Sequence, residues 1–391
     1  MTYGPLRDDQ LATVSDILAA AFATPLEQIG PWLARAGHEH VRVLADKGNP
    51  VAALLLLPMA HHFLGKRVPT VGIAGVGVAL ESRGHGAGRR LMDKTILEIA
   101  EQGAALSTLY PATQTLYRRS GYERAGKLLE VRVPTFALDT GHPRDRSIEV
   151  RPLGDGDALA VEALYAALAR EQHGYLDRNG YMWSRVRQPQ GKPARGFGFF
   201  AGDALEGYVY LRAQDGDSPP HHDVRLTDLV AATPRANRSI LRFFHDQRSL
   251  TEHVIFRTGP EAPVLSLLAE PRYDQEVVLD WMVRVTRVEA ALTQRGYPRS
   301  ADVTLELDVH DPLVEANAGR WTLRLKDGEA EVGRGGRGTI ALDVRVLAPL
   351  YTGYLSATAL RRLGWLDASD AALRDLEEVF RSPMPGMGEM F

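Results

Sequence analysis

Residues 75–92, GVGVALESRGHGAGRRLM, indicate how the first third of the chain folds. Apolar residues precede this stretch and an amphipathic pattern follows it, which predicts a strand over 68–80 and a helix over about 87–102. Glycines between a strand and a helix let the backbone approach an anion closely, and the N–H groups at the helix start attract it. The spacing does not fit the dinucleotide-binding fingerprint, and the Gly-Lys-Ser/Thr of a P-loop is missing. The stretch alone leaves two interpretations open, a phosphate site or a flexible turn with a solvated basic face.

A second motif, LYRRSGY at residues 116–122, follows a strand expected over 104–110. The strand, the RxxGxG turn, the helix, the next strand and LYxxxGY together resemble the acetyl-coenzyme A site of the GNAT N-acetyltransferases. The resemblance implies that backbone N–H groups near Val76 and Val78 bind the acetyl carbonyl, and that Tyr117 protonates the departing thiolate. It places the pyrophosphate of the cofactor on Arg83, Gly84, His85, Gly86, Ala87, Gly88 and Arg89.

The assignment of Tyr117 agrees with the chemistry of acyl transfer. Attack of an amine on a thioester builds negative charge first on oxygen and then on sulfur, and fixed backbone donors stabilise the first charge. A phenol with an ordinary pKa of ~10 is a suitable acid for a thiolate whose conjugate acid has a pKa of ~8.5. The alternative is that Tyr117 is a core aromatic on a short helix, and Tyr122 is expected to be structural.

The same order of predicted elements returns near residue 150, which indicates a duplicated domain. A helix over 158–169, strands over 197–201, 207–213 and 224–232, and a helix over 237–248 repeat the first pattern. The turn after the third of these strands, TPRANRSI at 233–240, contains no glycine. We therefore expect that the second unit does not bind coenzyme A, and is structural or forms a wall of the substrate cavity.

A third unit begins near Arg299 and alternates as half-buried strands do. Its predicted elements are strands over 303–309, 321–325 and 339–346 and helices over 357–363 and 370–380.

This order of units is similar to that of the Eis (enhanced intracellular survival) acetyltransferases. The stretches that carry the similarity, beside the two motifs above, are VTRVEAALTQRGY at 285–297, LDVRVLAPLYTGYL at 342–355 and the tail ending in Phe391. The resemblance implies an α+β fold with two tandem GNAT domains, whose mixed, mostly antiparallel sheets are flanked by helices, and a sterol-carrier-like α+β domain. The expected ranges are 1–147 for the catalytic domain, 148–290 for the degenerate one and 291–391 for the last.

The resemblance also implies a homohexamer and a role for the terminal carboxylate of Phe391 as the catalytic base. A free α-carboxylate has a pKa of about 3.5, so it needs a bridging water, burial or a partly neutral amine to act as a base. The alternative is a frayed tail.

The acceptor is expected to be a primary amine of a polyamine-like or aminoglycoside-like small molecule, or of a protein lysine. Candidate substrate residues are the acidic and aromatic side chains Phe22, Glu27, Trp32 and Glu389. Relatives carry an acidic residue directly before the terminal phenylalanine, whereas Met390 stands here, which puts aminoglycoside specificity in doubt.

Composition excludes several other classes. The chain has 391 residues, of which 45% are hydrophobic and 24% charged, and a net charge of −3, so no nucleic-acid or membrane partner is expected. The absence of cysteine excludes disulfides, thiolate metal sites and a thiol nucleophile. The pairs His61-His62 and His221-His222 lack further ligand spacing and are expected at the surface, so no metal is expected. Without a signal-peptide pattern, a cytoplasmic location is the expectation.

Two other functions compete with acetyl transfer. One is a lipid or sterol carrier with a non-catalytic GNAT scaffold, although the last third is short of large apolar residues that would line a tunnel. The other is a pseudoenzyme or interaction protein, which the intact Arg83, Gly86, Gly88 and Tyr117 argue against.

Overall fold

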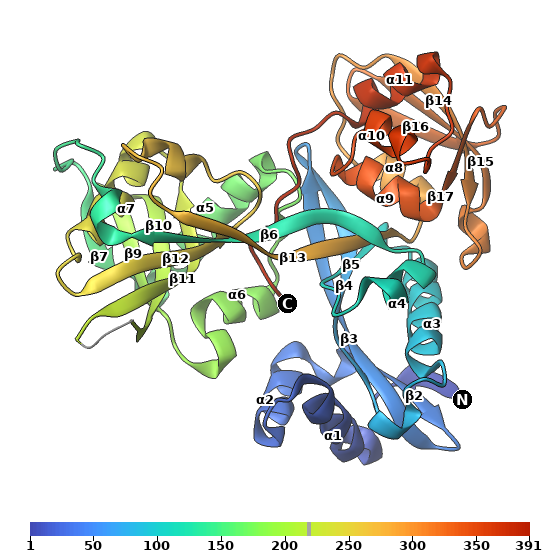
Figure 1. Cartoon of the computed structure of the whole chain (residues 1–391), viewed down its shortest axis with the longest axis horizontal. Coiled ribbons are helices and arrows are strands. Elements are labelled where there is room, and N and C mark those ends of the chain that lie inside the picture. The colour runs from blue at the N-terminus through green and yellow to red at the C-terminus, as the bar shows by residue number, and fades with distance from the viewer. Residues whose placement is uncertain (217–219) are drawn as a thin grey trace. The chain divides into compact units, whose positions relative to one another are not determined.

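The computed structural model describes residues 1–216 and 220–391, and the chain forms two compact units (Figure 1). Unit 1 contains residues 1–126, 280–385 and 391. Unit 2 contains residues 127–279 and 386–390. The limits of these units differ from the domain ranges expected from the sequence, and the strands Glu123–Pro134 and Asp274–Val285 each run from one unit into the other.

The first part of unit 1 is a sheet with helices on both faces (Figure 1). Its elements are β1 (Thr2–Pro5), α1 (Leu11–Phe22), α2 (Leu26–Ala36), β2 (Val41–Asp46), β3 (Asn49–Phe63), β4 (Lys66–Val78), α3 (Ala87–Glu101), β5 (Leu106–Leu109), α4 (Gln114–Arg119) and the start of β6 (Glu123–Pro134). Strand order is β1-β2-β3-β4-β5-β13, with β4 and β5 parallel. The strand expected over 68–80, the helix over 87–102 and the strand over 104–110 are confirmed as β4, α3 and β5, whereas β1, α2 and β6 were not predicted. α2 contains Gly30 and Pro31, which usually interrupt helices.

Unit 2 repeats this plan. Its elements are the remainder of β6, β7 (Glu149–Pro152), α5 (Ala158–Glu171), β8 (Leu176–Asp177), α6 (Gly180–Arg187), β9 (Arg195–Ala201), β10 (Ala204–Asp215), β11 (His222–Ala231), α7 (Pro234–His245), β12 (Thr251–Thr258) and the start of β13 (Asp274–Val285). Strand order is β6-β12-β11-β10-β9-β7, with β11 and β12 parallel. The predicted duplication is therefore confirmed by topology.

The two sheets exchange their last strands. In unit 1, β5 pairs antiparallel with residues 282–285 of β13, which lie beyond the second repeat in the sequence. In unit 2, β12 pairs antiparallel with residues 129–134 of β6, which end the first repeat. Each sheet is thus completed by a strand from the other half of the chain, which is why neither repeat closes as one continuous sequence segment.

The last part of unit 1 is a second, four-stranded sheet with helices. Its elements are α8 (Val288–Gln294), β14 (Val303–His310), β15 (Gly319–Lys326), β16 (Glu329–Arg334), β17 (Ile340–Asp343), α9 (Val344–Thr352), α10 (Ala357–Arg362) and α11 (Asp370–Phe380). The strand predicted over 339–346 is wrong beyond Asp343. The Asp343 carboxylate accepts a hydrogen bond from the Arg345 N–H at 2.8 Å, so it caps a helix where apolar alternation had indicated a strand.

A fully buried ion pair joins this last part to the first sheet within unit 1. The Arg284 guanidinium lies 2.7 Å from both carboxylate oxygens of Asp311, and neither side chain is exposed. Arg284 also donates from Nε to the Ser120 carbonyl at 3.1 Å, directly after α4. The pair therefore fixes the helix that carries Tyr117.

No helix among the described residues is both long enough and apolar enough to cross a membrane.

Candidate active site

A β-bulge opens one edge of β4. Leu55 pairs with Ala74 and Ala53 pairs with Gly77, so Gly75 and Val76 together oppose Leu54. Gly75 has a φ of +61°, a conformation that favours glycine. The parallel pairing with β5 covers only residues 70–73 of β4. Residues 74–78 therefore have no strand partner on that side in the described chain, and their backbone groups can bind a ligand.

The glycine-rich turn follows this free edge directly. Gly84 and Gly86 have φ values of +79° and +80°, and a Cβ at either would meet open space. Gly86 is the N-cap of α3 and no side chain caps it. Within the described chain, none of the N–H groups from Gly84 to Arg89 makes a short, well-aligned hydrogen bond to a protein acceptor. Available donors at a helix start, with open space where Gly84 and Gly86 lack a Cβ, fit a diphosphate.

The charged side chains around the turn differ in position. The Arg83 Nε lies 3.4 Å from the Val78 carbonyl, so this exposed guanidinium lies beside the end of β4. Arg89 points along α3 to Asp93 at 3.4 Å, and His85 is exposed. Arg83 thus places a cation beside the open edge of the strand.

Tyr117 lies in the same apolar cluster as these elements. Its ring and Ala87 are buried there, and Val76 and Val78 pack against the cluster. The Tyr117 hydroxyl makes no hydrogen bond in the described chain, yet it is not among the fully buried unpaired polar atoms, so it keeps some access to solvent. Burial raises the pKa of Tyr117 to about 12, which keeps the phenol protonated at neutral pH. Tyr122 is buried and donates to the Ser107 hydroxyl at 2.7 Å, so it is structural as predicted.

The last residue of the chain lies where β4 and β5 diverge. A Cβ on Gly72 would come within 3.0 Å of the Phe391 ring. The ring centroids of Phe391 and Tyr110, the residue after β5, are 5.6 Å apart. The ring of the terminal residue is therefore packed in unit 1 against the strand that carries the bulge.

Two of the four candidate substrate residues meet beside the bulge. The rings of Phe22 and Trp32 are in edge contact at 6.4 Å, and Trp32 covers Gly75, whose Cβ would come within 2.5 Å of it. Glu27 is exposed in the first turn of α2. Glu389 belongs to unit 2, where Arg178 already balances its charge at 2.6 Å.

Unit 2 closes the position that corresponds to the glycine turn. Thr233 is the N-cap of α7 and its hydroxyl accepts from the Ala236 N–H at 3.1 Å. Pro234, the first residue of the helix, has no N–H, and Arg235 is paired with Glu206. One donor at this helix start is therefore capped, one is absent, and the nearby cation is paired, so the turn offers less to a phosphate than the glycine turn of unit 1 does.

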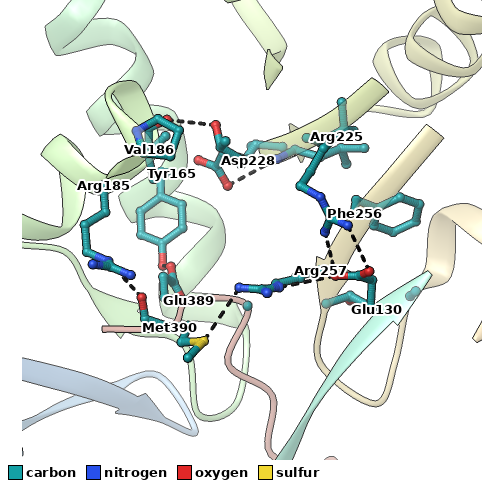
Figure 2. A pocket seen from close by; sticks show the side chains of 18 of the residues that line it. Glu130, Tyr165, Arg185, Val186, Arg225, Asp228, Phe256, Arg257, Glu389 and Met390 are labelled. Carbon is teal, nitrogen blue, oxygen red and sulfur yellow. Dashed lines mark hydrogen bonds and ion pairs between the residues drawn. The ribbon is translucent and has the colours of Figure 1, made fainter. Parts of the chain in front are cut away.

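A cavity of about 880 Å³ nevertheless lies in unit 2 (Figure 2). It opens between β11 and β12, beyond the short parallel pairing that ends at Arg225 and Ile255. Residues 388–390 of the chain form part of its wall, and Figure 2 shows Glu389 beside Tyr165.

The first histidine pair is buried, contrary to the expectation. His61 and His62 were predicted at the surface, but they are 0% and 5% exposed, because β3 is covered along this stretch. His61 stacks on Trp281 with ring centroids 5.5 Å apart.

One group of metal-ligand types exists within the described residues, in unit 2. It consists of Asp223, Glu252 and His253. The Arg132 guanidinium lies 3.2 Å from Asp223 and 3.0 Å from the His253 Nδ1, so a cationic group is already present beside these ligand atoms.

The last part of unit 1 has a cavity of about 870 Å³ with a polar border. Asp308, Asp343, Asp367 and Arg361 line it. Charged groups at this border do not favour a sterol or fatty acid, since burying them against an apolar ligand is costly.

The sequence analysis did not identify two glycines of β4 that shape the site. Gly72 leaves room for the Phe391 ring, and Gly75 forms the bulge. The signal was present, because glycines at 72, 75 and 77 inside one strand mark a bulge or a close approach of a ligand.

Comparisons with known proteins agree with this geometry. Two models of the acetyltransferase (GNAT) domain match residues 2–125 and 174–285, and a sterol carrier protein domain matches 288–388. No curated protein sequence matches the chain significantly. Among solved structures, a GCN5-related N-acetyltransferase from Anabaena variabilis ATCC 29413 is 30% identical with a TM-score of 0.93, and all of both chains is covered.

Two further structures extend the comparison. A GCN5-related N-acetyltransferase from Kribbella flavida is 26% identical with a TM-score of 0.86, covering 100% of this chain and 98% of that one. Eis1 from Mycobacterium abscessus shares the fold over 100% of both chains, with a TM-score of 0.82 and 22% identity. The predicted α+β fold of two GNAT domains and a sterol-carrier-like domain is confirmed, and the chain belongs to the GCN5-related N-acetyltransferase family with the Eis-like order of domains.

Proposed function

We propose that the chain transfers the acetyl group of acetyl-coenzyme A directly to a primary amine. The observation that carries the proposal is the alignment, along one strand, of the bulged edge of β4, the uncapped glycine turn and the packed C-terminal residue. The donors from Gly84 to Arg89, with Arg83, would hold the pyrophosphate, and the free edge at Val76 and Val78 would bind the acetyl carbonyl.

Each proposed catalytic group has a defined proton step. The amine nitrogen forms a bond to the thioester carbon while the carbon–sulfur bond breaks. The Phe391 carboxylate, directly or through water, accepts the proton that the amine loses, and Tyr117 donates its phenolic proton to the departing sulfur. A phenol with a pKa of about 12 is a weak acid toward a thiolate in water, but an apolar pocket raises the pKa of the thiol as well and narrows the difference.

The acceptor site is proposed beside Phe22 and Trp32, whose rings offer a wall for an amine with an extended or ring-shaped stem. Exposed Glu27 would attract its ammonium groups. Polyamines, aminoglycosides and lysine side chains all fit this chemistry. A homohexamer and a cytoplasmic location remain predictions, and light scattering on the purified chain measures the first.

A panel of spermidine, kanamycin and a lysine-containing peptide with a thiol-release readout tests the proposal. We expect turnover with at least one amine, and loss of turnover in an Arg83→Glu/Gly86→Asp variant. Acetyl-coenzyme A should raise the melting temperature of the wild type but not of this variant. Absence of any thermal response in the wild type would refute the enzyme interpretation.

Removal of Phe391 tests the base. We expect a strong fall in turnover with unchanged cofactor binding, and the same from a C-terminal tag. Unchanged turnover would exclude the terminal carboxylate from the mechanism.

A further inference from the structure

Unit 2 contains a buried ionic cluster that the proposed chemistry does not use. Arg178 is 5% exposed at its side chain and binds Asp228 through both terminal nitrogens, at 2.5 and 3.0 Å. Its Nε donates to the Glu389 carboxylate at 2.6 Å. Glu389 stands two residues before the end of the chain, and its side chain is equally buried.

Aromatic side chains hold this cluster in place. The Arg178 guanidinium lies 3.6 Å from the centroid of the Tyr165 ring, and the Tyr165 hydroxyl contacts Glu389 at 2.8 Å (Figure 2). The Tyr208 hydroxyl donates to Asp228 at 2.7 Å. One guanidinium thus bridges a carboxylate of β11 and a carboxylate of the C-terminal tail, with its plane supported by a ring.

The neighbouring tail residues are also held within unit 2. The Gly386 N–H donates to the His173 carbonyl at 2.8 Å, and Gly386 forms a parallel bridge with Lys127. Arg185 donates to the Met390 carbonyl at 2.8 Å (Figure 2). A chain end with side-chain and backbone contacts on successive residues does not fray as an ordinary terminus does.

The C-terminal tail lies at the position in unit 2 that corresponds to the proposed cofactor site in unit 1. Residues 388–390 line the opening between β11 and β12. The equivalent opening in unit 1, between β4 and β5, is the one where the proposed cofactor and the terminal residue lie. In unit 2 the turn that corresponds to the glycine turn is capped by Thr233, and residues 388–390 line the opening between the strands.

We propose that Glu389 is a positioning residue, and that its contacts with Arg178 and Tyr165, here called the clasp, hold the last residues of the chain and so limit the movement of the C-terminal carboxylate. The proposal rests on the proposed function of Phe391 as the base. Met390 alone separates Glu389 from Phe391, so the covalent chain keeps their Cα atoms within ~7 Å of each other, and a contact that fixes Glu389 also restricts how far the terminal carboxylate can move. A shift of ~1 Å in a reacting group can cost on the order of 100-fold in rate.

The substitution Glu389→Gln tests the clasp with little risk to the fold. Arg178 keeps its pair with Asp228, and glutamine retains a carbonyl oxygen for the Tyr165 hydroxyl. We expect kcat with the best amine of the panel to fall roughly 10- to 100-fold, with KM for acetyl-coenzyme A unchanged within about twofold. Glu171→Gln, an exposed glutamate at the end of α5 in the same unit, is the matched control and should leave kcat unchanged.

Glu389→Gln is also introduced into a chain that ends at Met390, and its effect on kcat is compared with its effect in the full chain. This comparison separates positioning of the terminal carboxylate from a general structural effect. If Glu389 acts through the terminal carboxylate, Glu389→Gln has no further effect on kcat once Phe391 is removed. An equal fall in both backgrounds would overturn the proposal, because the residue would then act independently of the carboxylate.

The outcomes distinguish the clasp from the base. If removal of Phe391 lowers kcat and Glu389→Gln does not, the clasp is refuted and the proposed function stands. If removal of Phe391 has no effect, the base itself is refuted. If Glu389→Gln does not fold, Arg185→Ala removes the contact to the Met390 carbonyl without burying a charge, and should lower kcat in the same way; unchanged kcat in that variant would refute the positioning role.

Discussion

Replacing Tyr117 by phenylalanine should separate catalysis from stability. The phenol ring is buried in the core cluster of unit 1, whereas its hydroxyl makes no hydrogen bond in the described chain. Phenylalanine keeps the packing and removes only an unpaired hydroxyl, so the free energy of unfolding should change by less than about 0.5 kcal/mol. Loss of a general acid typically costs 100- to 10,000-fold, and we expect kcat to fall by about this factor.

The measurement combines kcat for thiol release, the affinity for coenzyme A and urea unfolding of both chains. Because burial raises the pKa of Tyr117 to about 12, the phenol stays protonated throughout pH 7–10, and its ionisation should cause no loss of rate there. Full activity of the Tyr117→Phe variant would refute its role as the acid. A large loss of stability or of coenzyme A affinity would show that the hydroxyl has a structural partner instead.

Three further predictions concern packing, the terminus and alkaline pH. Arg284→Met leaves the Asp311 carboxylate buried without its cation, so the free energy of unfolding measured in urea should fall by about 3–5 kcal/mol. The double variant Arg284→Met/Asp311→Leu should recover part of this loss. A single variant as stable as the wild type would contradict the importance of the buried pair. Gly72→Val places methyl groups where the Met59 side chain and the Phe391 ring pack, so kcat should fall while coenzyme A binding, measured by calorimetry, persists; unaltered kcat would mean that catalysis does not depend on the position of the Phe391 ring against Gly72. The raised pKa of Tyr117 favours the protonated native state, so this contribution to stability is complete below pH ~10 and is lost as pH rises toward 12; Tyr117→Phe should therefore lose less stability than the wild type between pH 9 and pH 11.5 in urea titrations, and equal losses would argue against the raised pKa.

Much of the fold was predictable because local patterns agree with the tertiary structure. Strands β2 to β4 and helix α3 follow apolar periodicities that match their burial, and the glycine turn stands where a strand gives way to a helix. The alternation that continued beyond Asp343 was misleading, because a single capping carboxylate decides between strand and helix at that point. Periodicity alone carries no information about such a contact.

The exchange of β6 and β13 could not be read from the sequence. Both strands have ordinary patterns, and their partners are chosen by tertiary packing far along the chain. Arg178 was equally hidden, since nothing in its neighbourhood distinguishes it from a solvated arginine until the tail brings Glu389 to it. Long-range pairings of this kind depend on topology, whereas the RxxGxG and LYxxxGY motifs are local and were visible.

The central claim is that the glycine turn after β4 binds the pyrophosphate through its unused N–H groups. Calorimetric titration of coenzyme A into the wild type, Gly86→Asp and Gly48→Asp tests it most directly, because both glycines have a positive φ and open space beside them but only Gly86 is the N-cap of α3. We predict that the wild type and Gly48→Asp bind alike and that Gly86→Asp binds at least ~10-fold more weakly, since a carboxylate in place of the glycine repels the anion and displaces charge-assisted hydrogen bonds. Equal affinity of all three chains would contradict the account.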